Sequence, residues 1–123
     1  MKLRFRDNSL RLRLNQREVQ ALLAGQRVRE RVVFPGNAIL EYVLGSEQGT
    51  EASASFEQGT IQVIAPKSRV CAWASGEDLG LYFDFPANGS TLRVSIEKDL
   101  ECLDGPSEER DPEAFPRTSG KNC

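Results

Sequence analysis

Hydrophobic and polar residues alternate one by one over the first residues of the chain. Leu3 and Phe5 alternate with basic side chains, and residues 10–14 alternate leucine with arginine after a polar turn at residues 7–9. A period of two is typical of a β-strand with one buried face, so this pattern predicts a β-hairpin.

A helical pattern follows the predicted hairpin. Asn15 is suited to be a helix N-cap, Glu18 stands three residues later, and an apolar stripe with helical spacing runs up to Gly25. Two further strands are predicted at about residues 27–34 and 38–45, with a turn at residues 35–37 between them. The first half of the chain is therefore predicted to fold as strand, strand, helix, strand, strand.

The second half repeats this pattern at a lag of 51 residues. Over residues 5–37 the shift gives seven identities, which are Phe5 with Phe56, Val19 with Val70, Ala21 with Ala72, Gly25 with Gly76, Phe34 with Phe85, Pro35 with Pro86 and Asn37 with Asn88. The second copy predicts strands near residues 54–58 and 60–65, a helix at 67–75 opened by Pro66, and strands at 79–85 and 91–99. The Gly-, Ser- and Glu-rich segment 45–53 is the predicted linker.

These elements predict an α+β fold made of two ββαββ copies related by a pseudo-twofold axis. We expect eight strands in a curled or barrel-like antiparallel sheet with two helices against it, because one ββαββ unit alone would leave a sheet face bare. Residues 1–103 form one domain, built of copies at about 2–45 and 54–99, and residues 104–123 form an acidic, flexible tail. The shared core is expected around six aromatic residues: Phe5, Phe34, Phe56, Phe83, Phe85 and Trp73.

Composition excludes several classes of protein. The chain has 123 residues, no histidine and three cysteines, so it has no Ser-His-Asp or Cys-His catalysis and no His-ligated metal, and its cysteines lack metal-finger spacing. Nor does any apolar run approach the roughly 20 residues that span a bilayer. We expect a cytoplasmic protein with no membrane partner and no cofactor, in which Cys71 and Cys102 serve as small apolar residues.

Positive charge is concentrated in the first quarter of the chain. Residues 1–34 hold nine basic and three acidic side chains, and residues 35–123 hold seven basic and fifteen acidic ones. Strand alternation puts these cations opposite the apolar residues, and the candidates for binding an anion or a partner are Arg4, Arg6, Arg11, Arg13, Arg29 and Arg31. If all these strands share a sheet, their arginines form one surface.

Two interpretations of this arginine face remain open. It can bind an anionic ligand or a protein partner, or it can be neutralised by the chain's own acids. We favour a non-catalytic binding or interaction domain, because no nucleophile–base pair, ligand cluster or cofactor fingerprint occurs. The alternatives are a phosphate- or polyphosphate-handling enzyme and a nucleic-acid-binding protein; few aromatics and a pI of 5.2 disfavour nucleic acid.

The acidic segment near the C-terminus offers a partner for the arginines. Residues 97–113 carry eight acids and two cations, so we predict that carboxylates of this segment pair with Arg4, Arg6, Arg11 or Arg13. The docking candidates are Glu97, Asp99, Glu101 and the anchor Phe115. A flexible tail that aids solubility is the alternative, and the same carboxylates are a weak candidate for a cation site.

Three segments resemble a family of small uncharacterised bacterial proteins. They are the Asn-Ser-Leu-Arg-Leu-Arg-Leu strand at residues 8–14, the Glu-Lys-Asp-Leu-Glu-Cys-Leu segment at 97–103, and the Ala-Phe-Pro motif at 114–116 within an acidic tail. The resemblance implies a bacterial domain of this family and no particular activity.

Overall fold

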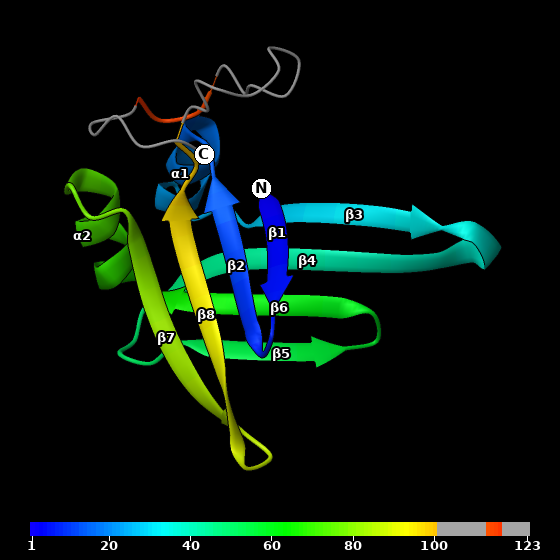
Figure 1. The fold of residues 1–123 in the computed structure, drawn as a ribbon. Coiled ribbons are helices and arrows are strands. Elements are labelled where there is room, and N and C mark those ends of the chain that lie inside the picture. The colour runs from blue at the N-terminus through cyan, green and yellow to red at the C-terminus, as the bar shows by residue number, and fades with distance from the viewer. Residues whose placement is uncertain (101–112, 117–123) are drawn as a thin grey trace.

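The computed structural model describes residues 1–100 and 113–116 and contains two four-stranded sheets and two helices (Figure 1). In chain order the elements are β1 (Lys2–Arg6), β2 (Ser9–Leu14), α1 (Gln16–Leu23), β3 (Val28–Phe34), β4 (Ala38–Glu47), β5 (Ser53–Glu57), β6 (Thr60–Pro66), α2 (Lys67–Ser75), β7 (Gly80–Ala87) and β8 (Ser90–Lys98), with a 3₁₀ turn at Pro35–Asn37. The α+β class and the order of elements agree with the prediction from the pattern.

The strands form two mixed sheets that are not closed into a barrel, so the barrel-like form of the expected antiparallel sheet is wrong. Sheet A has the order β1-β2-β8-β7 and sheet B the order β3-β4-β6-β5. The hairpins pair antiparallel within themselves, but β2 pairs with β8 and β4 with β6 in parallel. Each sheet therefore joins a hairpin from each half of the chain, and four edge strands remain.

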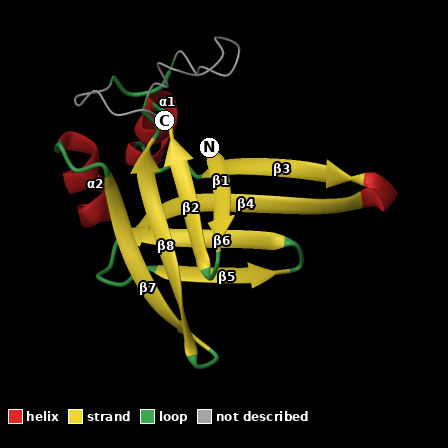
Figure 2. Ribbon diagram, in the orientation of Figure 1, coloured by secondary structure: helices red, strands yellow, loops and turns green. Residues whose placement is uncertain are grey.

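Figures 1 and 2 show sheet A lying across sheet B, with both helices at one corner of the sandwich. The core fills the space between the facing sides of the sheets and the helices. Its buried members include Leu12 and Ile96 from sheet A, Leu44 and Val63 from sheet B, and Trp73 from α2. Burial of these side chains is the main force that holds the layers together.

The predicted aromatic core is half wrong. Trp73 and Phe83 are buried and Phe85 is partly buried, but Phe5 is 60% exposed, Phe34 48% and Phe56 68%. The two sheets cover each other only partly, since the β3–β4 hairpin extends past β1 in Figure 1. Leucine, isoleucine and valine fill most of the central core instead.

The predicted linker begins too early. β4 continues to Glu47, and Gly45 is buried inside it with its backbone close to Ile64 and Arg27: a Cβ on Gly45 would lie 3.1 Å from Ile64 Cδ1. A glycine inside a strand can therefore mark close packing against neighbouring side chains, and here it does not mark the start of a loop.

Helix α1 begins with the capping box that the sequence predicts. The Asn15 side chain accepts a hydrogen bond from the backbone N–H of Glu18 at 2.9 Å, and the Glu18 carboxylate accepts one from the backbone N–H of Asn15 at 3.0 Å. We expect Asn15→Ala to lower the free energy of unfolding by about 1 kcal/mol, measured by urea denaturation. Asn15→Ser keeps the cap and should cost less; equal losses in both variants would contradict the capping role.

Candidate functional site

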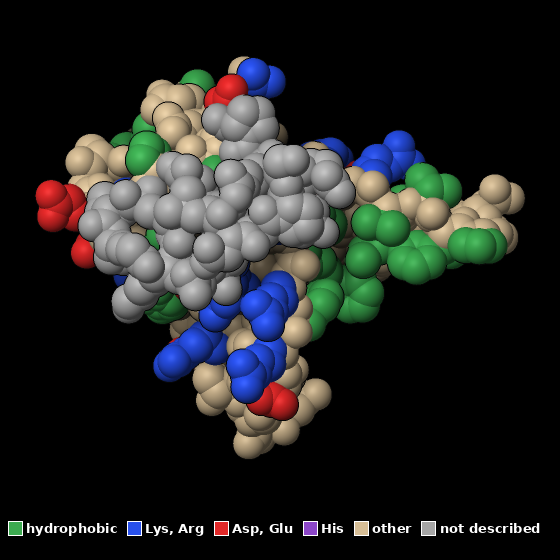
Figure 3. All heavy atoms as spheres, turned by 45° about the horizontal axis from the view of Figure 1, so that its top comes forward, with side chains coloured by type: hydrophobic (Ala, Val, Ile, Leu, Met, Phe, Trp, Pro, Cys, Tyr) green, Lys and Arg blue, Asp and Glu red, His purple; other side chains and the backbone are tan. Residues whose placement is uncertain are grey.

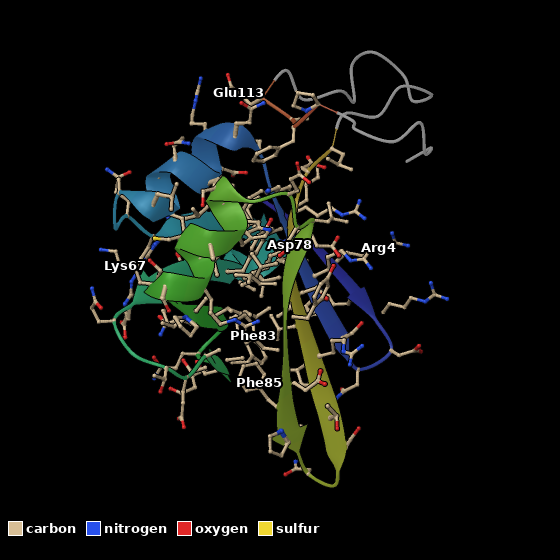
Figure 4. All side chains as sticks on the ribbon, turned by 90° about the vertical axis from the view of Figure 1, so that its left-hand side faces the viewer. Arg4, Lys67, Asp78, Phe83, Phe85 and Glu113 are labelled. Atoms are coloured by element: carbon tan, nitrogen blue, oxygen red, sulfur yellow. The ribbon has the colours of Figure 1, made fainter. Side chains whose placement is uncertain are left out.

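The outward side of sheet A carries a cluster of cations, which we call the basic face. The antiparallel pairing of β1 with β2 places Lys2 opposite Arg13 and Arg4 opposite Arg11, so cations of the two strands lie side by side. The alternate residues Leu3 and Phe5 lie opposite Leu12 and Leu10, on the core side of the sheet. The basic face consists of Lys2, Arg4, Arg6, Arg11, Arg13 and, from β8, Arg93. Figure 3 shows Lys and Arg side chains gathered on one side of the molecule, and Figure 4 shows Arg4 pointing away from the sheet.

One buried carboxylate organises the centre of the basic face. Glu97 of β8 is 5% exposed, and its Oε1 lies 3.4 Å from Nε of both Arg11 and Arg13. The Tyr82 hydroxyl donates a hydrogen bond to its Oε2 at 3.3 Å. Partial burial, the Glu97 charge and this hydrogen bond together raise the pKa of Tyr82 above its ordinary value. Two arginines thus share one carboxylate.

Glu97 fits because the neighbouring strand has a glycine opposite it. Gly80 of β7 pairs with Glu97, and a Cβ on Gly80 would lie 2.9 Å from Glu97 Cγ and 2.9 Å from the Ile96 carbonyl oxygen. We expect Gly80→Ala to lower the free energy of unfolding by about 1–3 kcal/mol through overpacking, measured by urea denaturation. The exposed Ala72→Ser on α2 is the control; a Gly80→Ala protein as stable as this control would contradict the close contact.

Asp99, directly after β8, holds the end of the basic face. It is 6% exposed, and its Oδ2 lies 2.8 Å from Lys2 Nζ. Its backbone amide donates to the Leu14 carbonyl at 2.8 Å, and its carbonyl accepts from the Phe115 amide at 2.7 Å. Asp99 therefore connects β1, β2 and the segment at 113–116.

Among the described residues, the basic face carries more positive charge than the carboxylates paired with it. Three carboxylates in these ranges pair with its six cations: Asp84 pairs with Arg93 in a fork at 2.9 and 3.1 Å, Glu97 pairs with Arg11 and Arg13, and Asp99 pairs with Lys2. This exposed fork also lowers the pKa of Asp84 through the hydrogen bond from Arg93. Within the part of the chain that the structure describes, Arg4 and Arg6 are exposed and make no ion pair.

Arg29 and Arg31 do not belong to this face, because the condition for one arginine surface, a sheet shared by β1, β2 and β3, is not met. They lie on β3 in sheet B, and both approach the Glu41 carboxylate, Arg29 at 2.9 Å and Arg31 at 3.8 Å. The prediction assumed that β1, β2 and β3 share a sheet, whereas β3 follows α1 into the other layer. As candidates for a shared site, Arg29 and Arg31 are thereby separated from Arg4, Arg6, Arg11 and Arg13.

The described part of the acidic tail contacts α1 and the end of β8. Phe115 pairs with Leu100 in a short parallel bridge, packs against the core, and has Lys98 Nζ 5.7 Å from the centre of its ring. The Glu113 carbonyl accepts a hydrogen bond from the Gln16 amide at 2.8 Å. Glu101 lies outside the described residues, and the docking role of the whole tail stays a prediction.

A family model matches residues 1–119. The chain belongs to a family of unknown function, DUF7009. Neither the curated proteins nor the solved structures contain a match to the chain. The match is consistent with the uncharacterised family inferred from the sequence, while the three motif segments and the bacterial origin stay predictions.

A hollow in this DUF7009 member lies between α2 and β7. It measures about 250 Å³ and is lined by Trp73, Tyr82, Arg69 and Asp78, the last of which is labelled in Figure 4. The Arg69 guanidinium lies 4.5 Å from the centre of the Phe83 ring, which places a cation on an aromatic face. Because the one cation and the one carboxylate in its lining offset each other, the basic face is the stronger candidate for binding charged ligands.

Among the described residues, no group of three or more acidic or cysteine side chains is placed to hold a metal. The one described cysteine, Cys71, is exposed on α2. No helix in the described ranges has the length and apolar character to cross a bilayer.

Sequence reasoning missed Arg93 of the basic face and two residues of β7 beside it, Tyr82 and Gly80. Because Arg93 is adjacent to the apolar Val94, the sequence pattern indicates that Arg93 points outward. The pattern does not indicate that β8 pairs in parallel with β2, which brings Arg93 beside the other cations. Tyr82 and Gly80 matter because β7 then lies on the far side of β8. Strand order is set by contacts distant in sequence, which local alternation does not encode.

Proposed function

We propose that this chain is a non-catalytic binding domain whose basic face takes an anionic partner, an acidic segment of another protein. Arginine forks form charge-assisted hydrogen bonds with carboxylates, and several together give selectivity for a dense run of negative charge. Support comes from two observations on the described part of the chain: cations outnumber their paired carboxylates on this face, and Arg4 and Arg6 are exposed and make no ion pair there.

We also propose that the chain consists of two ββαββ units related by a pseudo-twofold axis. Exchanging β1–β4 with β5–β8 turns the strand order of sheet A into that of sheet B. The registers agree as well, since Lys2 opposite Arg13 has its counterpart in Ser53 opposite Ile64, 51 residues later.

The two units differ in the charge of their first two strands. The five cations of β1 and β2 have these counterparts on β5 and β6: Ser53 for Lys2, Ser55 for Arg4, Glu57 for Arg6, Gln62 for Arg11 and Ile64 for Arg13. The same strand geometry therefore forms without any cation at these positions. Positive charge on sheet A is not a requirement of the fold, so we assign it to binding.

A nucleic acid fits the face less well than an acidic polypeptide. Tyr82 is the aromatic side chain that the described part of the face offers for stacking on a base, and it already donates to Glu97. Nucleic-acid surfaces usually combine a positive groove with several stacking aromatics. Inorganic polyphosphate remains an outcome of the experiment below.

The test is a titration of the full chain with fluorescent decaglutamate, a ten-nucleotide single-stranded DNA and tripolyphosphate at low and moderate salt. The double variant Arg4→Gln/Arg6→Gln should bind decaglutamate about fivefold or more weakly, since two exposed ion pairs contribute about 0–1 kcal/mol each. Its matched control, Arg29→Gln/Arg31→Gln, removes the same charge from sheet B and should change affinity less than twofold.

Three outcomes contradict the proposal. They are no binding of decaglutamate at low salt, equal losses in the two double variants, and a clear preference for the oligonucleotide or tripolyphosphate. The last would move the assignment to one of the alternative functions. Binding that weakens as salt rises is expected for ion pairing on an exposed surface.

A further inference from the structure

The open edge of β1 adds a second kind of contact to the basic face. The Asn8 and Leu14 carbonyls accept hydrogen bonds from Arg93 and Asp99, on the β8 side. Because backbone groups alternate in direction along a strand, the groups of Arg11 point the other way, toward Arg4 of β1. Leu3 and Phe5, the alternate residues of β1, therefore direct their N–H and C=O groups to the unpaired side. No backbone hydrogen bond joins that side to another described element.

β1 differs from the other three edge strands of the described structure. Arg29 and Arg31 of β3 pair with Glu41. β7 contains Pro86 and also Asp84, which pairs with Arg93 of β8. β5 carries serines and Glu57 on its outward side. On β1, open backbone groups and the uncommitted cations Arg4 and Arg6 occur on one strand.

An uncovered apolar surface lies beside this edge. Val32 and Phe34 share the inner side of β3 with the buried Val28, yet they are 40% and 48% exposed because sheet B extends beyond β1. Phe5 on the inner side of β1 is 60% exposed. Figure 3 shows apolar side chains next to the Lys and Arg cluster on the same face of the molecule.

We propose that an extended segment of a partner protein, alternating acidic and apolar residues, adds to sheet A as a fifth strand beside β1. Its backbone pairs with Leu3 and Phe5, its acidic side chains face outward to Arg4 and Arg6, and its apolar side chains turn inward onto Phe5, Val32 and Phe34. Strand addition of this kind takes affinity from main-chain hydrogen bonds and specificity from alternate side chains. This inference rests on the proposed function and specifies the form of the partner.

Two synthetic peptides of equal composition test the alternation. One alternates four glutamates with three valines, and the other groups the glutamates before the valines. We expect the full chain to bind the alternating peptide at least tenfold more tightly. Equal affinity for the two peptides would overturn strand addition but not the proposal of an anionic partner. If neither peptide nor decaglutamate binds the full chain, the proposal of an anionic partner is itself contradicted.

Two substitutions of Phe5 distinguish backbone pairing from side-chain contact with the peptide. Phe5→Pro removes the outward N–H, and Phe5→Val keeps it; proline is tolerated at an edge strand whose N–H faces solvent. We expect Phe5→Pro to lower the affinity for the alternating peptide at least tenfold and the affinity for decaglutamate less than twofold. Phe5→Val should lower the affinity for the alternating peptide less than threefold. Equal losses in both variants would contradict main-chain pairing.

A measurement on the unaltered chain covers the case in which Phe5→Pro fails to fold. Two versions of the alternating peptide carry backbone N-methyl groups, one on the valines and one on the glutamates. One set of N–H groups must face β1, so we expect one version to lose binding at least tenfold more than the other. Equal affinities would overturn the proposal. Sedimentation that shows a dimer dispersed by Phe5→Pro would also overturn it, since a second copy would then occupy the edge.

Discussion

Trp73→Ala is expected to lower the free energy of unfolding by about 3–5 kcal/mol, the range for truncating a buried aromatic residue. Trp73 is 1% exposed and is the largest of the fully buried side chains. Its indole N–H donates to the Leu79 carbonyl at 2.9 Å, so the ring ties α2 to the segment that leads into β7. Since a domain is typically stable by about 5–15 kcal/mol, this loss is a large share of the total.

Urea denaturation followed by circular dichroism measures this loss. Cys71→Ala on the same helix is the control, because Cys71 is exposed and its truncation should change stability by about 0.5 kcal/mol or less. Leu22→Ala probes a fully buried position on α1 and should cost about 2–5 kcal/mol. A Trp73→Ala protein as stable as the Cys71→Ala protein would contradict a core centred between the helices and the two sheets.

Glu97→Gln should raise the affinity for decaglutamate about fivefold at low salt and reduce stability at the same time. The substitution removes the one charge that Arg11 and Arg13 share at 3.4 Å, while the amide still accepts the hydrogen bond from Tyr82. Two freed arginines then add to Arg4 and Arg6, and each exposed pair contributes about 0–1 kcal/mol. Loss of a charged acceptor should cost about 1.5–3 kcal/mol of unfolding free energy.

The comparison variant is Asp84→Asn, which frees Arg93 instead. The Asp84–Arg93 pair is exposed on both sides, so its removal should change stability little. Titrations with decaglutamate and urea denaturation of both variants give the two quantities. If Glu97→Gln binds decaglutamate no more tightly than the unaltered chain, Arg11 and Arg13 take no part in anion binding.

Local pattern was enough to predict the elements, because each is determined by neighbours in sequence. The period-two residues of β2, the Asn15 cap and the helix at 67–75 all lie where the pattern places them. Pairing between distant strands was not predictable this way. The barrel-like antiparallel sheet failed because β2 and β8 pair in parallel, and periodicity within a strand does not distinguish parallel from antiparallel neighbours.

The candidate site was predictable in composition and not in extent. Alternation placed Arg4, Arg6, Arg11 and Arg13 on one side of a hairpin correctly, since a hairpin's register follows from its short turn. Arg29 and Arg31 lie in a different sheet from the other four arginines, because α1 connects β2 of sheet A to β3 of sheet B. The exposure of Phe5, Phe34 and Phe56 also depends on how far one sheet covers the other, which the sequence pattern does not contain.

The most direct test of the central claim is an amide chemical-shift map of the full chain during titration with decaglutamate. If the basic face of sheet A is the anion-binding surface, the largest shifts should fall on β1 and β2, at Leu3 to Arg6 and Arg11 to Arg13, with small shifts on β3. Shifts should shrink as salt rises, because the contacts are ionic and exposed. Shifts centred on Arg29 and Arg31, or none above those of a neutral polyglutamine peptide, would contradict the account.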